Sequence, residues 1–397
     1  MNSLKKIRIQ GFKSIVDQEF EPGQVNVLIG ANGGGKTALL EAIGMLSAAM
    51  NGKVDNTALQ GRGVRLGTRY QSAFKGLDTP QMSLSIQWQD DQLNDKLAYS
   101  VTLTPPNHKA AWHYQEESLR LNEQWIMQRT SESKKVQRID RGVGFDAITI
   151  ENHRLQVFLE ALKSYAIYTP TTPALRDLVT DMVPLETDFP MSFCGNRLAE
   201  AIEEVIDIEN ETYGHLDLDE VLDMLDWTDN ITTGVASVEI LSPYVPRLQK
   251  VIRFTDRFMP ENNNVLTAYD ASEGSLYVLF LLTIAMHSQA PRLFAVENFD
   301  QALNPRLARA TVDLFCQAIL GNPNEPVAFL TTHNPLVLDG IDILDERIRL
   351  FAIDRDNSGY STINRVTVTE ELVKKGQDGM TLSDLWVMGL LGGVPRL

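Results

Sequence analysis

The residues with the clearest chemistry lie in segment 25–40, VNVLIGANGGGKTALL. This segment matches the pattern G-x-x-x-x-G-K-[ST], in which the backbone N–H groups of a glycine-rich turn surround phosphate oxygens at the positive end of a helix. The lysine of such a loop reaches the β- and γ-phosphates, and the hydroxyl of the last residue binds Mg²⁺. The pattern predicts a nucleotide site whose binding residues are Gly30, Asn32, Gly33, Gly34, Gly35, Lys36 and Thr37.

The elements on either side of this turn support the same interpretation. Residues 25–29 are apolar and predict a buried strand, and a helix is expected to begin at Lys36. The alternative is a glycine-rich turn that matches the pattern by chance. A strand before the turn and a helix after it are the context that a phosphate-binding loop requires, and they disfavour that alternative.

Two further apolar segments end in residues that suit a nucleotide site. Residues 292–296, RLFAV, predict a strand that ends at Glu297, where a carboxylate can hold Mg²⁺ through water. Residues 327–331 predict a second buried strand, and His333 follows it closely enough to bridge to a γ-phosphate. We expect both side chains at the edge of a largely parallel sheet, because strands alternate with helices in this half of the chain.

A third group lies at the start of an apolar helix expected over residues 276–286. Ser272, Gly274 and Ser275 precede or open that helix, and a helix N-terminus binds anions through its unpaired N–H groups. The sequence therefore predicts a second anion-binding site.

The order of these motifs resembles that of the ABC-type ATPases related to SMC and RecF proteins. In that resemblance residues 30–37 are the Walker A loop, 272–275 the signature motif, Glu297 the Walker B residue, 301–304 the D-loop and His333 the switch histidine. The N-terminal IRIQGFKSI also resembles the opening of that superfamily. The resemblance implies ATP and Mg²⁺ as cofactors. It also implies a homodimer, or a higher homo-oligomer, that encloses two ATP molecules between the phosphate loop of one subunit and the signature motif of the other.

Several segments are similar to standalone ATPases of bacterial anti-phage defence and abortive-infection loci. They are YTPTTPALR, CGNRLAEAI, TTHNPLVLDGI and LSDLWVMGLLGGVP. The resemblance covers both ends of the chain well and residues 51–150 poorly, and no glutamine is a convincing Q-loop residue.

One departure from the family bears on catalysis. The family's Walker B strand ends in two adjacent acids, of which the second orients the attacking water, whereas Glu297 is followed by Asn298. An amide is no general base, so hydrolysis is expected to be slow unless Asp300 substitutes. Alternatively, Asn298 is a harmless variant and hydrolysis proceeds normally. The candidate catalytic residues are thus Asn298, Asp300 and His333.

Composition indicates a folded α/β protein of more than one lobe. Of the 397 residues, 43% are hydrophobic and 22% charged, which is ordinary for a globular protein, and the length exceeds that of a single core. We expect an N-terminal lobe with an antiparallel β part over residues 1–150, an inserted helical lobe over 151–260 and a C-terminal lobe over 261–397. No apolar run is long enough for a membrane span or a signal core, so a cytoplasmic location is expected.

Charge is distributed unevenly. Residues 1–150 have a net charge of +3 and residues 151–397 a net charge of −19, within a total of −16. Arg62, Arg65 and Arg69 raise the possibility of a local nucleic-acid contact, against the alternative of a solvated or self-pairing surface. The acidic segment LDLDEVLDMLD, residues 216–226, predicts a helix with a solvated acidic face in preference to a Ca²⁺ loop, because it lacks the necessary glycine.

Some residues are expected to be structural. Trp227 is predicted to be a core or interface anchor, and Cys194 and Cys316 to be buried thiols. Asp354 and Asp356 are predicted to lie in a solvated turn, with a metal site as the alternative.

Two classes of function remain open. The preferred one is a nucleotide-gated switch or scaffold that controls a separately encoded effector, expected to be a nuclease, in anti-phage defence. The alternative is a RecF-like DNA-repair ATPase with DNA-stimulated hydrolysis. The acidic balance favours the scaffold.

Overall fold

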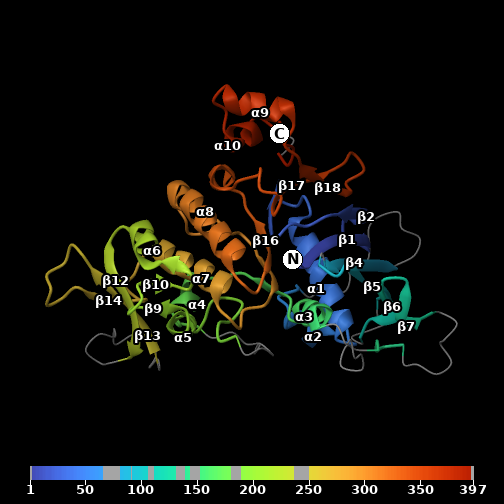
Figure 1. The fold of residues 1–397 in the computed structure, drawn as a ribbon, viewed down its shortest axis with the longest axis horizontal. Helices are drawn as coiled ribbons and strands as arrows, with labels where there is room; N and C mark the ends of the chain where they lie inside the picture. Colours follow the sequence, from blue (N-terminus) through green and yellow to red (C-terminus); the bar gives the residue numbers. More distant parts are fainter. Residues whose placement is uncertain are drawn as a thin grey trace.

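The computed structural model describes residues 2–65, 81–90, 92–105, 111–130, 139–143, 153–179, 189–236 and 250–394. Within these ranges the chain forms two six-stranded sheets and two three-stranded sheets. The two large sheets lie in one half of the molecule and the insertion extends from the other (Figure 1).

The central sheet carries the segments that the sequence singled out. Its strand order is β18-β17-β3-β16-β15-β8, with β17, β3, β16, β15 and β8 parallel and β18 antiparallel to β17. The strands are β3 (Val25–Ile29), β8 (Ala166–Tyr168), β15 (Leu293–Val296), β16 (Val327–Thr331), β17 (Ile348–Arg355) and β18 (Ser361–Val366). Because the carboxyl ends of parallel strands meet at one edge, the loops after β3, β15 and β16 come together.

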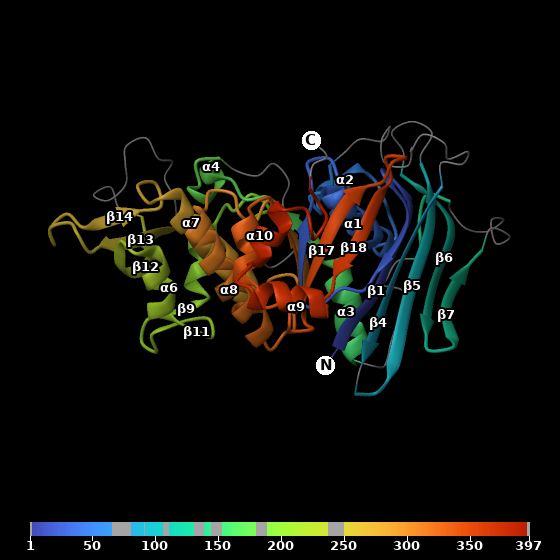
Figure 2. The ribbon, with the colours of Figure 1, turned by 90° about the horizontal axis from the view of Figure 1, so that it is seen from above.

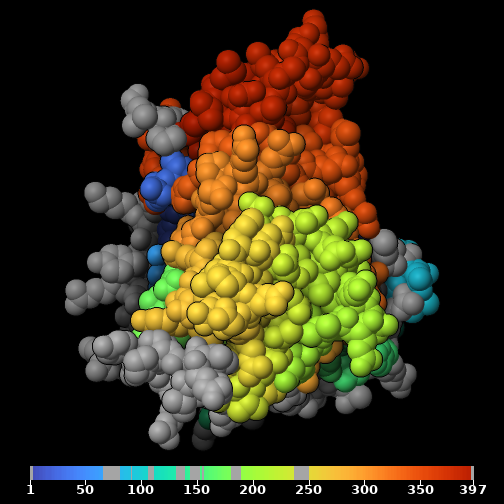
Figure 3. Space-filling view, turned by 90° about the vertical axis from the view of Figure 1, so that its left-hand side faces the viewer, coloured from blue at the N-terminus to red at the C-terminus, as the bar shows by residue number. Residues whose placement is uncertain are grey.

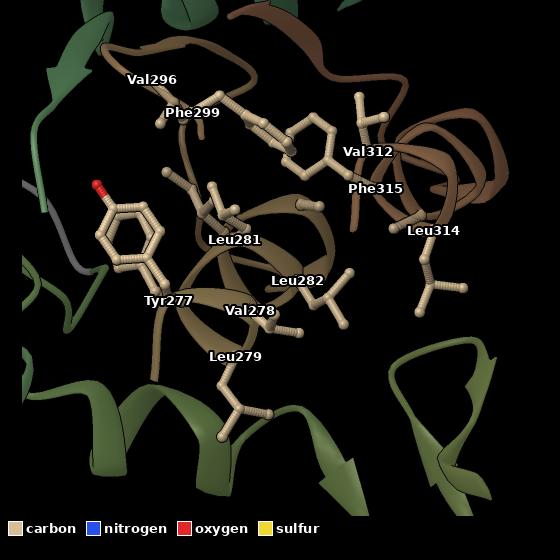
Figure 4. Close-up of a cluster of buried hydrophobic side chains, with 14 of the residues drawn as sticks. Tyr277, Val278, Leu279, Leu281, Leu282, Val296, Phe299, Val312, Leu314 and Phe315 are labelled. Carbon is tan, nitrogen blue, oxygen red and sulfur yellow. The ribbon is translucent and has the colours of Figure 1, made fainter. Parts of the chain in front are cut away.

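Helices cover both faces of this sheet, which is why its strands read as continuous apolar runs. On one face α7 (Glu273–Met286) and α8 (Pro305–Gly321) pack on Val27 and Val296, and Figure 4 shows this cluster around Leu281. On the other face α1 (Lys36–Met50) and α3 (His153–Lys163) pack against the sheet. All of α1 except Thr37 is buried, because a second sheet covers its outer side.

That second sheet is antiparallel and confirms the predicted N-terminal β lobe. Its order is β2-β1-β4-β5-β6-β7. The strands are β1 (Asn2–Phe12), β2 (Ile15–Phe20), β4 (Met82–Asp90), β5 (Asp95–Thr104), β6 (His113–Leu121) and β7 (Gln124–Arg129). Before β6 the chain is not paired in the sheet, since the backbone N–H of Trp112 donates to Val54 O, 2.8 Å away. The strand β7 was not predicted.

The insertion is less helical than the sequence predicted. The helices α5 (Leu198–Glu203) and α6 (Leu218–Leu225) flank three two-residue strands, β9 (Ile206–Asp207), β10 (Thr212–Tyr213) and β11 (Leu216–Asp217). A second small sheet follows, with β12 (Thr228–Val235), β13 (Lys250–Asp256) and β14 (Val265–Thr267). The chain does not continue as one helix after α5. The side chain of Asp207 accepts the N–H groups of Glu209 and Asn210 and turns the chain.

The acidic repeat in the insertion forms a helix, as predicted. The side chain of Asp217 caps α6 by accepting the N–H of Asp219 at 2.9 Å. The apolar residues Val221, Leu222 and Leu225 of this helix are buried. Figure 3 shows the insertion as a broad face below α8 and the C-terminal helices.

The remaining helices are short and lie around the central sheet. They are α2 (Asn56–Gln60), α4 (Thr172–Leu175), η3 (Pro335–Gly340), α9 (Glu370–Gln377) and α10 (Leu382–Val387). In Figure 2, α4 and α2 lie along the same edge of the molecule. No helix within the described ranges combines the length and apolar character that a bilayer crossing requires.

The predicted structural roles of the cysteines and acidic residues agree with the fold in most respects. Cys316 is buried, and burial raises the pKa of its thiol to about 12, whereas Cys194 is only half-buried. Asp356 accepts the N–H groups of Ser358 and Tyr360 in a turn, as expected. Asp354 has a different role, because it accepts the N–H of Gly393 at 2.8 Å.

Candidate functional site

The glycine-rich turn between β3 and α1 has the backbone shape of a phosphate-binding loop. Gly30, Gly33 and Gly35 have φ angles of 154°, 77° and 125°, which side-chain-bearing residues rarely adopt. A Cβ at Gly30 would lie 2.3 Å from Ile353 O, so this position requires glycine. No side chain caps the start of α1, and its first N–H groups therefore point to the space where an anion can bind.

Lys36 lies at the centre of this turn. Its Nζ donates to Gly30 O at 2.5 Å and to Ala31 O at 3.2 Å, and the residue is only 6% exposed. Burial lowers the pKa of Lys36 to about 8, while the charges of Glu297 and Asp300 act to raise it. An anionic ligand would return this ammonium to full protonation, because it adds negative charge where water has been removed.

Thr37 and Glu297 form the part of the site that suits a divalent cation. The Thr37 hydroxyl donates to Glu297 Oε1, so two oxygen ligands from α1 and from the end of β15 already lie together. Mg²⁺ is bound in such sites by one or two protein oxygens, phosphate oxygens and water. Within the described ranges no group of three or more His, Cys, Asp or Glu side chains could hold a metal ion. The donor set fits Mg²⁺ held jointly with a nucleotide.

The predicted catalytic residues follow β15 and β16. Asn298 has a φ of 57°, a left-handed conformation that Asn tolerates well, and its N–H donates to Thr331 Oγ1 at 2.9 Å. Asp300 Oδ1 accepts the backbone N–H of His333 at 3.2 Å, which joins the two loops. Burial, followed by the charge of Lys36, lowers the pKa of His333, which favours the neutral imidazole at pH 7.

A cavity of about 550 Å³ connects these groups. It is lined by residues of the glycine-rich turn and of the segments that follow β15 and β16, namely Asn32, Gly33, Gly34, Gly35, Lys36, Thr37, Glu297, Asn298 and His333. Asp300 is not a lining residue, although its Oδ1 accepts the backbone N–H of His333, which is one. Ser272, Gly274 and Ser275 are not among the lining residues, so the structure does not bring the second anion site to this cavity.

Lining residues that the sequence analysis missed add positive charge to the cavity. Lys13, Arg65 and Arg355 join Lys36 around it, with Ser14 between them. Lys13 belongs to the turn of the N-terminal strand pair, and Arg355 ends β17. The only sequence signals were the IQGFKSI motif for Lys13 and the arginine-rich segment for Arg65.

A buried carboxylate places two of these cations. Glu41 on α1 is fully buried, and it accepts Lys13 Nζ as well as the Nε and the backbone N–H of Arg65, at 2.8 and 3.2 Å. Arg65 is therefore directed to the nucleotide cavity rather than to a separate nucleic-acid surface.

Of the three arginines in the suggested nucleic-acid contact, Arg62 is buried among other parts of the fold. Arg62 is 9% exposed and donates to Ser47 Oγ at 2.7 Å, and also to the carbonyls of Ala58 and Lys163. It thus connects α1 to α2 and to the end of α3. Arg69 lies outside the described residues.

The C-terminal part of the chain supports the glycine-rich turn from outside. Arg355 Nε donates to Gly33 O at 2.7 Å, and the Ser361 hydroxyl donates to Gly34 O at 2.5 Å. Gly393 packs so closely on Gly30 that a Cβ there would lie 3.1 Å from the Gly30 Cα. These contacts fix the direction of the loop carbonyls.

The residues of the predicted second anion site lie at the start of α7. Ser272 is exposed and caps the helix, with its Oγ accepting the N–H of Ser275 at 3.2 Å. Ser275 is 3% exposed, and its hydroxyl lies 2.6 Å from Ser272 Oγ and 2.9 Å from Trp227 Nε1. Gly274 lies next to the loop before α8, since a Cβ there would be 3.2 Å from Ala302 O.

Solved structures that are similar to this chain include heads of SMC proteins. An SMC head domain from Pyrococcus furiosus, bound to the C-terminal domain of ScpA, has a TM-score of 0.51 and 13% identity, and the match covers 95% of this chain and 99% of that one. The SMC head domain from Thermotoga maritima has a TM-score of 0.45 and 15% identity, over 92% and 100% of the two chains. The first of these likenesses shows that the chain has an SMC-head type of ATPase fold.

A comparison with curated proteins gives no match. A protein family matches residues 25–339, which are more than half of the chain and include the glycine-rich turn, the start of α7, Glu297 and His333. The chain therefore belongs to the family described as "AAA domain, putative AbiEii toxin, Type IV TA system".

Proposed function

We propose that this protein binds ATP with Mg²⁺ in the cavity around Lys36 and uses the nucleotide as a switch. The observation that carries the proposal is the combination of an uncapped α1 N-terminus, four cationic side chains around the cavity and the Thr37–Glu297 oxygen pair. The loop N–H groups and Lys36 would hold the phosphates, and Thr37 and Glu297 would hold Mg²⁺. The metal ion, when bound, supplies charge neutralisation at the phosphates.

Nucleotide titration tests the binding step. Lys36→Ala should abolish ATP binding and leave the fold intact, because the Nζ of Lys36 hydrogen-bonds, among the described residues, to carbonyls of the glycine-rich turn. Lys53→Ala is the matched control, since Lys53 pairs with Asp55 away from the cavity. Unchanged ATP affinity in Lys36→Ala would overturn the assignment.

We propose further that ATP joins two copies of the chain. Because Ser272 and Gly274 lie outside their own subunit's cavity, each signature segment would contact the γ-phosphate held by the partner. Gly274→Gln should block ATP-dependent self-association while the isolated subunit still binds ATP. Light scattering with a non-hydrolysable ATP analogue measures the association, and a variant that still associates would contradict the arrangement.

Slow turnover would suit a switch better than a motor. Asn298 occupies the position next to Glu297 where a general base is expected, and its amide accepts no proton. Asp300 is held by the His333 N–H, on the loop that would approach the γ-phosphate. ATP would then stay bound for long periods and stabilise the dimer.

We propose that the ATP-bound dimer restrains a separately encoded effector, a nuclease, in the cytoplasm during anti-phage defence. The toxin–antitoxin description of the family supports a partner of this kind, and one SMC head of similar fold binds a domain of another protein. Co-expression with the product of the adjacent gene, followed by affinity purification with and without ATP, tests the proposal. ATP-dependent co-purification and loss of phage protection in Lys36→Ala support it. DNA-stimulated phosphate release without such a partner would instead favour the DNA-repair alternative.

A further inference from the structure

One of the side chains through which the insertion contacts the start of α7 is that of Trp227. This residue lies between α6 and β12 and is half-buried, and its ring packs at a tilt against Phe254 of β13, with 5.2 Å between the ring centroids. Its indole Nε1 donates to Ser275 Oγ at 2.9 Å. The insertion is thereby connected directly to the helix start at which Ser272 lies.

These contacts form a chain of three polar groups whose direction can be worked out. An indole N–H only donates, so Ser275 Oγ must accept from Trp227. A backbone N–H likewise only donates, so Ser272 Oγ must accept from the N–H of Ser275, at 3.2 Å. What remains is the contact of 2.6 Å between the two hydroxyls, where either oxygen could donate.

Burial decides between the two directions. If Ser272 donated to Ser275, the buried Ser275 hydroxyl would accept two bonds and its own hydrogen would have no acceptor among the described residues. A buried donor without a partner is unfavourable. If Ser275 donates to Ser272, every buried group is satisfied, and the hydrogen of the exposed Ser272 hydroxyl points away from the chain.

We propose that Trp227 is a positioning residue that makes the Ser272 hydroxyl an obligate outward donor to phosphate. This inference rests on the proposed ATP-bound dimer, in which Ser272 meets the γ-phosphate held by the partner. A phosphate oxygen accepts hydrogen bonds, so a serine fixed as a donor binds it well, whereas a serine whose hydrogen is used inward presents lone pairs to it. Trp227 thus ties the quality of this contact to the packing of the insertion.

Trp227→Phe tests the inference, because it keeps the aromatic ring on Phe254 and removes only the N–H. Without that donor the Ser275 hydroxyl is no longer held in place beside Ser272 and ceases to fix the Ser272 hydroxyl as an outward donor. We expect ATP-dependent self-association to weaken about tenfold at each of two equivalent sites, or about a hundredfold overall. ATP affinity of the isolated subunit should stay as in the wild type, since the Lys36 cavity is separate. Trp386→Phe is the matched control, because Trp386 is 6% exposed and its Nε1 forms no hydrogen bond with a described residue.

A double variant distinguishes an oriented hydrogen-bond chain from simple packing. With Ser275→Ala, Ser272 has no hydroxyl neighbour to which it can donate inward, so adding Trp227→Phe should change self-association by less than about twofold. If Trp227 acted only through packing, Trp227→Phe would weaken ATP-dependent self-association by the same factor in the Ser275→Ala background as in the wild type.

The outcomes separate the inference from the proposal beneath it. If the wild type shows no ATP-dependent association, the proposed dimer is overturned, and this inference with it. If the wild type associates and Trp227→Phe associates equally well, the dimer stands and the role of Trp227 is overturned. If Trp386→Phe is weakened as much as Trp227→Phe, the effect comes from indole loss in general, and the role of Trp227 is again overturned.

Discussion

Alkaline pH should weaken ATP binding because it removes the charge of Lys36. Burial lowers the pKa of this side chain to about 8, from an ordinary value of 10.5. The phosphates of ATP would surround the ammonium with negative charge, so its pKa in the complex returns to about 10.5 or higher. ATP therefore binds the protonated form preferentially, and its affinity must fall as the pH rises above 8.

The size of the loss follows from the two pKa values. With about 8 in the free protein and about 10.5 in the complex, the dissociation constant rises about 30-fold between pH 7 and pH 9.5. This corresponds to about 2 kcal/mol at 25 °C. A lysine with an ordinary pKa in both states would produce almost no change over that range.

Titration of a fluorescent ATP analogue at constant ionic strength and saturating Mg²⁺ measures this profile. Lys36→Arg is the control, because a guanidinium stays charged throughout and its profile should be nearly flat, whatever its affinity. A flat wild-type profile would refute the reasoning, and so would a slope equal to that of Lys36→Arg. Either result would mean that Lys36 is not desolvated as its burial indicates.

Three further predictions concern the same cavity. Asn298→Asp should raise steady-state phosphate release on the order of 10²-fold. Asn298→Glu should raise it less, because a φ of 57° at this position suits Asp better than Glu. If the wild type releases phosphate as fast as the Asn298→Asp variant or faster, the general base is Asp300. Glu297→Gln should remove most of the affinity that Mg²⁺ adds to ATP binding. ATP titrations of the variant in Mg²⁺ and in EDTA measure this, and a difference as large as that of the wild type would contradict the prediction. Gly393→Val should weaken ATP binding about tenfold, because the valine side chain would press on Gly30. Gly376→Val should leave the ATP affinity unchanged, since a Cβ at Gly376 meets nothing within 4 Å. Equal ATP affinities of the two variants would exclude a role for the C-terminal segment.

The loops that bear the nucleotide motifs could be predicted because their information is local. The strand over 25–29 and the glycines after it lie within one short segment, and the strand over 327–331 has the predicted bounds. The resemblance also pointed to the SMC-head type of fold, which the comparisons confirm. The side chains that complete the cavity were not predictable in this way.

Lys13, Arg65 and Arg355 become cavity residues only through long-range packing. Lys13 and Arg65 are placed by the buried Glu41, and Arg355 by the pairing of β17 with β3. No periodicity in the sequence records such contacts. Trp227 was predicted to be an anchor, and its packing against Phe254 agrees with that prediction. Its hydrogen bond to Ser275 could not be predicted, because 48 residues separate Trp227 and Ser275 in the sequence.

The support of the glycine-rich turn by the C-terminal segment determines when the turn can take its shape during synthesis. β3 lies between β16 and β17, and the loop carbonyls bond to Arg355 and Ser361, yet all of these partners leave the ribosome long after residues 30–37 do. The loop is thus among the first parts of the chain to be translated and among the last to be ordered. A nascent or truncated chain that ends before β17 lacks both supports, so the proposed ATP binding would require that translation has passed Ser361.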